Sequence, residues 1–303
     1  MGRTRDGAVT PPVRLSVALV VATAVACAVP GVGLVAASVL PHVAIVALVM
    51  VVGSASGWLT QRRAAAVLGD GLWLPFNQVV GVAWLLLPSV AWTPVGLLDG
   101  CGPWTVAAVY LVAYDTLGAV THRLFHALPV LWPIHEVHHH QTVYQPTLAA
   151  RVHAAEPVRT IAAAAFLGWL LGGDTSAMWS LAVILPLWGY TVHMPVRIPL
   201  GPLEWVLVTP QYHAIHHSAE PRHHDRNFGN VFTLGDLLMG TACWDPEPVR
   251  EYGTGDVPAW EADRPTVAAA ARAWWGGLWH PVRRWFGMKS PQIPAPELRD
   301  VRG

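Results

Sequence analysis

Charged residues are scarce in this chain, and the few that are present cancel. Only 13% of the 303 residues are Asp, Glu, Lys or Arg, and the formal net charge is +0; soluble domains carry about 25% charge. The sequence has no basic arm or stripe, which argues against nucleic acid as a partner. With 53% hydrophobic residues and a mean hydropathy of +0.39, the composition predicts an integral membrane protein.

Cysteine is almost absent too. Cys27, Cys101 and Cys243 lie far apart and match no zinc-binding spacing, so we interpret them as structural or incidental thiols. The chain shows no internal repeat, and the glutamate ligands of soluble di-iron bundles are not evident. A metal site in this chain would therefore use other ligands.

Long apolar runs occupy most of the first 114 residues. They cover residues 15–40, 43–59, 72–90 and 104–120. The first run is too long for the apolar core of a signal peptide and suits a membrane span. Arg14 and Arg62 put the outer ends of the first two runs on one side, which is cytoplasmic under the positive-inside rule.

The fourth run returns the chain to that side, so the histidine-rich segment after it is placed at the cytoplasmic face. Two further runs, 161–171 and 177–192, are short for a full span of about 20 residues. We predict an all-α integral membrane protein with four to six transmembrane helices and a cytoplasmic, histidine-rich helical cap. We expect three divisions of the chain: membrane helices at residues 1–114, a histidine-rich catalytic domain at 115–245, and an interfacial helix with a disordered tail at 246–303.

The C-terminal part combines tryptophan with arginine between residues 264 and 288. This pattern predicts an interfacial helix that lies on the membrane or caps the histidine-rich domain. A helix packed into the core of the cap is an equally good alternative. The tail from 291 to 303, rich in proline and without apolar periodicity, is predicted to be disordered.

Histidine is concentrated in one part of the chain, with thirteen of the fifteen histidines between His122 and His224. Many are three or four residues apart, which places them on one face of a helix. The candidate ligands are His122, His126, His135, His138, His139, His213, His216 and His217, with His193 as a possible ninth. Because a single structural zinc needs only four ligands, this number implies two metals.

Three alternatives to a catalytic metal site stay open for the histidines. Solvated surface histidines or a pH-sensing cluster would not account for the repeated spacing. A histidine-rich metal transporter would place polar residues inside the spans, yet Asn77 and Gln78 are the main polar pair there. A non-catalytic relative that keeps the fold would be expected to lose ligands.

The motifs resemble those of one known family. Residues 115–126 (DTLGAVTHRLFH) and 131–139 (LWPIHEVHH) are similar to an acidic residue followed by HRxxH and WxxHxxHH. Residues 151–156 (RVHAAE), 209–218 (TPQYHAIHHS), 227–230 (NFGN) and 236–241 (DLLMGT) continue the pattern in the same order. Together they resemble the fatty acid hydroxylase superfamily, also called the sterol desaturase family, of membrane-bound di-iron oxygenases.

The resemblance implies two iron ions held by the eight histidines, molecular oxygen, an external electron donor such as a reductase, ferredoxin or cytochrome, and a lipid C–H bond as target. It leaves open hydroxylation or desaturation, an aldehyde-processing activity of the same site, and the identity of the lipid. No cytochrome b5 module is expected in the short tail, so electrons would come from a separate protein.

Residues beside the ligands are expected to orient them, since metal-bound histidines usually donate their other N–H to a carboxylate or carbonyl. The acidic candidates are Asp115, Glu136, Glu156, Asp225 and Asp236, although ordinary caps or ion pairs are as good an interpretation for each. Asn227 would orient a ligand or cap a turn, and His153 would support the site rather than bind metal. His140, His223 and His224 depart from the family pattern and are left out of the ligand set.

Overall fold

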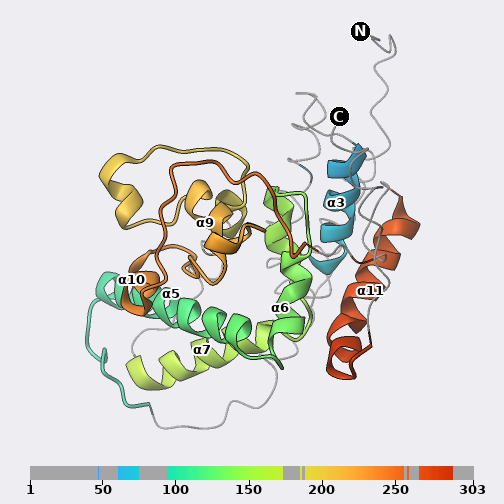
Figure 1. Cartoon of the computed structure of the whole chain (residues 1–303). Coiled ribbons are helices and arrows are strands. Elements are labelled where there is room, and N and C mark those ends of the chain that lie inside the picture. Colours follow the sequence, from blue (N-terminus) through green and yellow to red (C-terminus); the bar gives the residue numbers. More distant parts are fainter. Residues whose placement is uncertain are drawn as a thin grey trace.

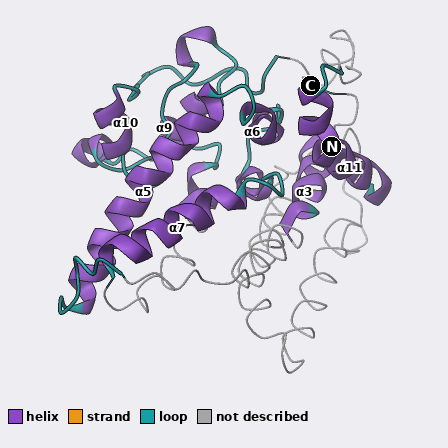
Figure 2. Cartoon of the chain, turned by 90° about the horizontal axis from the view of Figure 1, so that it is seen from below, coloured by secondary structure: helices purple, strands orange, loops and turns teal. Residues whose placement is uncertain are grey.

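The computed structural model describes residues 61–74, 94–172, 188–255 and 266–288, with residues 47, 185 and 258. Within these ranges the chain is helical, as predicted, and contains no β-strand (Figure 2). Two isolated β-bridges, Leu207 to Phe232 and Ser218 to Tyr252, tie loops together. The helices are α3 (Gln61–Gly71), α5 (Pro103–Ala127), α6 (Trp132–His139), α7 (Pro157–Leu171), α9 (Pro210–His216), α10 (Leu234–Met239) and α11 (Val267–Trp285), with 3-10 turns at Pro146–Ala150, Gly201–Trp205 and Pro221–His223.

Helix α5 is the long helix expected from the run at 104–120. It extends to Ala127, so the first pair of histidines lies in its last turns. Among the described residues it is the one helix that is long and apolar enough to cross a membrane. Helix α7 runs beside it (Figure 1) and packs Leu167 and Leu171 against Val106 and Tyr110 of α5.

The other predicted spans lie largely outside the described residues. This applies to the runs at 15–40 and 43–59, to most of 72–90 and 177–192, and to the predicted disordered tail. The run at 161–171 forms α7, which has 15 residues and is therefore short for a span, as its sequence indicated. The described residues thus establish a helical protein with one candidate membrane span.

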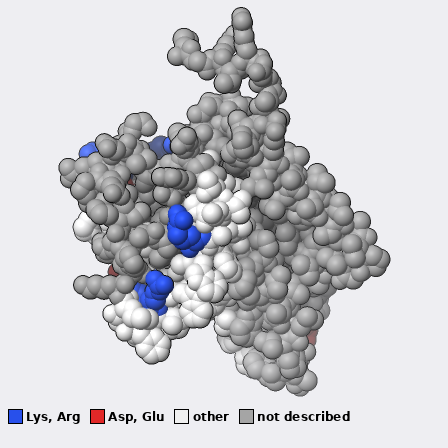
Figure 3. Space-filling view, turned by 90° about the vertical axis from the view of Figure 1, so that its right-hand side faces the viewer, with Lys and Arg blue, Asp and Glu red and all other residues white. Residues whose placement is uncertain are grey.

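Helix α11 packs against the rest of the described protein through one of its faces. One face is buried and contains Ala270, Ala273 and Gly277, and the helix contacts both α3 and α6. The opposite face leaves Trp275 and Trp279 about half exposed, at 56% and 42%. Figure 3 shows this side of the molecule, where a few basic side chains lie among uncharged residues of the part that the structure describes. The helix thus packs against α3 and α6 and presents aromatic side chains on its other face, while its predicted position at the membrane surface stays a prediction.

Gly277 permits the close approach of α11 to its neighbours. A Cβ atom at this position would lie 2.8 Å from Cζ2 of the fully buried Trp73 and 3.3 Å from Cγ1 of Val137. We expect Gly277→Ala to lower the free energy of unfolding by about 1–3 kcal/mol, the usual cost of overpacking a core. The measurement is thermal unfolding in detergent.

Gly168 in α7 is a matched control, because a Cβ there would meet nothing within 4 Å. Gly168→Ala should leave the melting temperature unchanged or raise it, since alanine favours helix over glycine. Equal melting temperatures for the Gly277→Ala variant and the wild type would show that α11 does not pack as described.

Candidate metal centre

The helices and one turn bring the histidines of the three sequence runs to one place. Their spacing along α5, α6 and α9 directs each pair or triplet to one side of its helix. Thr209 caps the N-terminus of helix α9, because its hydroxyl oxygen accepts a hydrogen bond from the backbone N–H of Tyr212 at 3.3 Å. His193 arrives from the end of a separate helical segment, and its backbone N–H donates to the carbonyl of Gly189.

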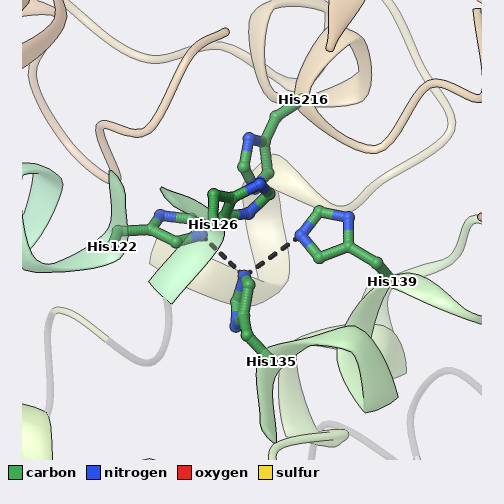
Figure 4. Close-up of side chains that lie close together, drawn as sticks. All are labelled: His122, His126, His135, His139 and His216. Carbon is green, nitrogen blue, oxygen red and sulfur yellow. Dashed lines mark hydrogen bonds between the residues drawn. The ribbon is translucent and has the colours of Figure 1, made fainter. Parts of the chain in front are cut away.

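The nine predicted histidines form two adjoining groups. The five-histidine cluster comprises His122, His126, His135, His139 and His216 (Figure 4), and the four-histidine cluster comprises His138, His193, His213 and His217. Within each group one ring nitrogen per residue lies within 4.8 Å of all the others. The rings of His139 and His217 stack across the boundary with centroids 4.5 Å apart. The structure therefore brings together every histidine named as a candidate ligand and separates them into two sets.

The contact between His122 and His135 indicates what the five-histidine cluster is built to hold. Nδ1 of His122 lies 3.0 Å from the carbonyl oxygen of Phe228, and Nδ1 of His135 lies 3.0 Å from Oε1 of Glu156. Because both oxygens are acceptors, each Nδ1 carries the hydrogen and each Nε2 of the neutral ring carries a lone pair. The two Nε2 atoms are nevertheless 2.8 Å apart. Two lone pairs at this distance repel each other unless a cation lies beside them.

The same arrangement occurs at three more rings. Nδ1 of His138, His193 and His216 faces a backbone carbonyl oxygen at 3.1, 2.7 and 2.8 Å, respectively. Nε2 of His193 then lies 3.1 Å from Nε2 of His213 and 3.2 Å from Nε2 of His217. Rings anchored through Nδ1 with Nε2 directed at a common point are the usual geometry of metal-ligating histidines.

Two buried ring nitrogens support this interpretation. Nε2 of His126 and Nε2 of His216 have no hydrogen-bond partner among the described residues, although both are shielded from solvent. A buried polar nitrogen without a partner costs free energy, so such atoms are rare unless something binds them. The donor set of each cluster thus fits a transition metal, for which imidazole is a common ligand.

Burial keeps the rings in the form that binds metal. Loss of solvent, the main cause, lowers the pKa of His138 to about 3 and that of His193 to about 4, against an ordinary value of 6.5. Burial and the neighbouring imidazoles hold the pKa of His139 and His213 well below 6.5. These rings are therefore neutral at physiological pH, and neutral imidazole is the ligating species.

The five acidic candidates divide into different roles. Glu156 contacts a cluster histidine directly, through the 3.0 Å pair with Nδ1 of His135, and also faces Arg159 at 3.2 Å. Asp225 is more distant, with Oδ1 3.7 Å from Nδ1 of His126. Glu136 points away from both clusters and faces His280. One carboxylate of the five thus makes a short contact with a histidine of the two clusters.

The other two acidic residues shape the loop between α9 and α10. Asp115 accepts hydrogen bonds from the backbone N–H groups of Val231 and Phe232 at 2.9 and 2.8 Å. Asp236 accepts from the backbone N–H groups of residues 228 and 229 at 2.7 and 2.8 Å. Asn227 fastens the same loop, because its side chain bonds to the backbone of Tyr212 and Cys243. These residues hold the carbonyl of Phe228 where His122 meets it.

The remaining histidines lie outside the two clusters. His153 bonds through Nε2 to the carbonyl of Leu278 in α11 at 3.1 Å, and its predicted role in supporting the metal site stays a prediction. His223 lies between Ser218 and Asp245, and His224 is exposed. His140 joins Glu136 and His280 in a third buried group. His280 was not predicted from the sequence as a site residue, because no other histidine lies within fifty residues of it in the sequence.

Part of the chain is similar in sequence to known proteins. Residues 107–241 match the family model described as fatty acid hydroxylase. Alkylglycerol monooxygenase of Danio rerio is 28% identical over 162 residues, which cover 48% of this chain and 33% of that protein. Ornithine lipid hydroxylase OlsE of Rhizobium tropici is 28% identical over 129 residues (43% and 39%). Very-long-chain aldehyde decarbonylase GL1-1 of Oryza sativa subsp. indica is 27% identical over 198 residues (60% and 30%).

These matches are partial in length. The chain spans about a third of each of these three relatives, so the similarity concerns only part of each. No solved structure matches significantly. All eight histidines of the three runs lie inside the segment that matches the family model, and so does His193.

Proposed function

Residues 107–241 belong to the fatty acid hydroxylase superfamily, and on this basis we propose that the chain is a membrane-bound, O₂-dependent oxidoreductase that hydroxylates or desaturates a lipid. The observation that carries the proposal is the geometry of the two clusters, in which anchored rings direct Nε2 lone pairs at one another. Two sites of four and five histidines, side by side, suit a pair of redox metal ions.

We infer that the metal is iron. Two bound iron ions would supply the oxidising power that no side chain possesses, with dioxygen and two electrons from a separate donor. For hydroxylation, the balance is one lipid C–H bond, O₂, two electrons and two protons in, and one alcohol and one water out. For desaturation, the same oxidant and electrons remove two hydrogen atoms and yield two waters.

The chain's own residues hold and orient the site in this proposal. The nine histidines supply the ligand nitrogens, and the carbonyls of Phe228, Arg151 and Arg226 fix three of the rings through Nδ1. Glu156 fixes His135 in the same way and makes that ring more basic. Because seven of the nine histidines are buried and the other two are partly buried, bulk water is kept from the site.

The substrate class rests on the relatives and on the apolar scaffold. The names of two relatives specify an alkylglycerol and an ornithine lipid as the molecules on which they act. In this chain the first cluster histidines lie in the last turns of α5, the candidate membrane span. A lipid held in the bilayer beside α5 would therefore have its chain close to the clusters.

Comparative lipid profiling tests the proposal. Cells that express the chain should contain a lipid that is heavier by one oxygen or lighter by two hydrogens, and this lipid should be missing without the gene. His135→Ala should abolish the product, since this ring is anchored by Glu156 and contacts two other rings of its cluster. An unchanged lipid profile, or a product that persists in a well-expressed His135→Ala variant, would reject the proposal.

We further propose a multi-pass topology with the clusters on the cytoplasmic side, from the positions of Arg14, Arg62 and Arg63. Cys101 is exposed and lies before α5, so it should react with a membrane-impermeant maleimide applied to intact cells. In a variant with its native cysteines replaced, His224→Cys should react only after permeabilisation, because His224 is exposed next to the cluster region. Labelling of His224→Cys in intact cells would contradict the proposed topology and place the clusters on the outer side of the membrane.

A further inference from the structure

A third group of potential ligands lies on the other side of α6 from the two clusters. It consists of Glu136 of α6, His140 directly after the end of α6, and His280 of α11. Their side chains are buried, with 7%, 3% and 2% of their surfaces exposed. One ligand atom from each lies within 4.8 Å of the others. None of the three belongs to the nine-histidine centre.

We propose that Glu136, His140 and His280 form a separate site for a divalent transition metal of the zinc type, which fastens α11 to α6. Two histidines and one carboxylate are an established ligand set for zinc, with water in the fourth position. The proposal is independent of the oxidoreductase function, because it involves different residues and a different contact between elements.

The distances fit such an ion. Nε2 of His140 and Nε2 of His280 are 3.3 Å apart. Zinc binds imidazole nitrogen at about 2.0–2.1 Å with tetrahedral geometry, which places two ligand nitrogens about 3.3 Å from each other. Oε2 of Glu136 lies 2.7 Å from Nε2 of His280, and a modest opening of this pair would admit the ion.

Hydrogen bonding alone does not account for the geometry. Nε2 of His280 faces both Oε2 of Glu136 and Nε2 of His140, yet an imidazole nitrogen carries at most one hydrogen. If that hydrogen goes to the carboxylate at 2.7 Å, the nitrogen has no lone pair left to accept from His140. Nδ1 of His140 lies 2.8 Å from the hydroxyl of Thr254, which holds the ring with Nε2 directed inward. This resembles the anchoring through Nδ1 that is seen at five of the nine cluster histidines.

The charge around the site is compatible with a cation. Arg284 places Nε 3.3 Å from Oε2 of Glu136, so it balances the carboxylate when no metal is bound. Because the side chain of Arg284 is 49% exposed, solvent screens its charge. The side chain can also turn toward solvent when a metal ion binds. Arg284→Gln should consequently leave metal binding intact or strengthen it, because it removes the competing cation.

The consequence of the site is structural. Helix α11 contacts α6 and α3 (Figure 1). The contacts of His280 with Glu136 and His140 join α11 to α6 and to the residue that follows it. Loss of this ion alone should loosen α11 and leave the nine-histidine centre occupied. The site would thus make attachment of the C-terminal helix dependent on metal.

The test uses the full chain in detergent, stripped with a chelator and reloaded with Zn²⁺, with bound metal counted by elemental analysis. We expect His280→Gln to bind one ion fewer than the wild type, since glutamine can still donate to Glu136 but is a poor zinc ligand. The same difference of one ion should appear in a His216→Ala background. As a second readout, Zn²⁺ should protect α11 from protease in the wild type but not in His280→Gln.

Three results decide the matter. A deficit of one ion with loss of protection, found also in His140→Ala, supports the site. Equal metal content in the wild type and both variants shows that the three residues form only a hydrogen-bonded attachment and overturns the proposal. Loss of more than one ion from His280→Gln with an unchanged melting temperature would also overturn it, because the group would then be part of the nine-histidine centre.

Discussion

Alanine at His138 or at His216 is expected to remove one metal ion from the chain and to abolish lipid oxidation. His216 belongs to the five-histidine cluster and His138 to the four-histidine cluster, so each variant damages one set of ligands. Loss of a residue that merely orients a ligand costs about 10–100-fold in affinity or activity. Loss of a ligand should cost more. The measurement is elemental analysis of anaerobically purified protein, together with product formation.

His224→Ala is the matched control, because His224 is exposed and lies outside both clusters. It should keep the full metal content and activity. The melting temperature of each variant must be compared as well, since an emptied metal site also destabilises a fold. If His138→Ala and His216→Ala both retained the metal content of the wild type, the two-site assignment would be wrong.

Glu156→Gln is expected to weaken metal binding by about 10–100-fold without unfolding the chain. The carboxylate accepts a hydrogen bond from Nδ1 of His135 at 3.0 Å, and this bond keeps Nε2 of His135 directed at the five-histidine cluster. An amide is neutral and offers a hydrogen-bond donor as readily as an acceptor, so the ring loses its charged anchor. Competition with a chelator of known affinity measures the change.

Glu220→Gln provides a comparison for this variant. Glu220 contacts Arg222 on the surface and none of the nine cluster histidines. Its replacement should leave metal affinity unchanged. A Glu156→Gln variant with wild-type affinity would show that Glu156 serves only its ion pair with Arg159, which is 3.2 Å away.

The positions of the histidines could be anticipated because helix periodicity is a local property. Residues three or four apart on α5, α6 and α9 share a face wherever the helices lie, so their spacing predicted eight of the nine residues that the structure brings together. His193 lies outside these runs and was only a possible ninth ligand. The division of the nine histidines into groups of five and four depends on how α6 is rotated between α5 and α9. That rotation is a matter of tertiary packing, which spacing does not encode.

The backbone anchors could not be predicted for the same reason. The carbonyl of Phe228 meets His122 across 106 positions of the sequence, and only the folded loop brings them together. Asp115 and Asp236 were candidates for orienting histidines, yet they bind backbone N–H groups of that loop. Buried N–H groups need acceptors, and a nearby carboxylate satisfies two of them at once.

Helix α3 was not anticipated, because the sequence suggested the end of a membrane span there. Its Asp70 is fully buried and accepts a hydrogen bond from Thr147 at 2.7 Å, and it also faces Arg151 at 3.8 Å. Arg151 in turn donates from Nε to the carbonyl of Val137 in α6. A chain of buried polar contacts therefore links α3 to the helix that carries three cluster histidines, and its partners are too far apart in sequence to be paired by inspection.

Oxygen-dependent lipid oxidation can be measured directly by supplying membranes that contain the chain with NADPH, a compatible reductase and ¹⁸O₂, and analysing the lipids by mass spectrometry. We expect an oxygen-dependent product that is absent from the His135→Ala variant. A hydroxylated lipid should carry one ¹⁸O atom, whereas a desaturated lipid should carry none. Product that forms without oxygen, or that forms at the wild-type rate in a folded His135→Ala variant, would contradict the assignment of the two histidine clusters as an oxygen-dependent metal centre.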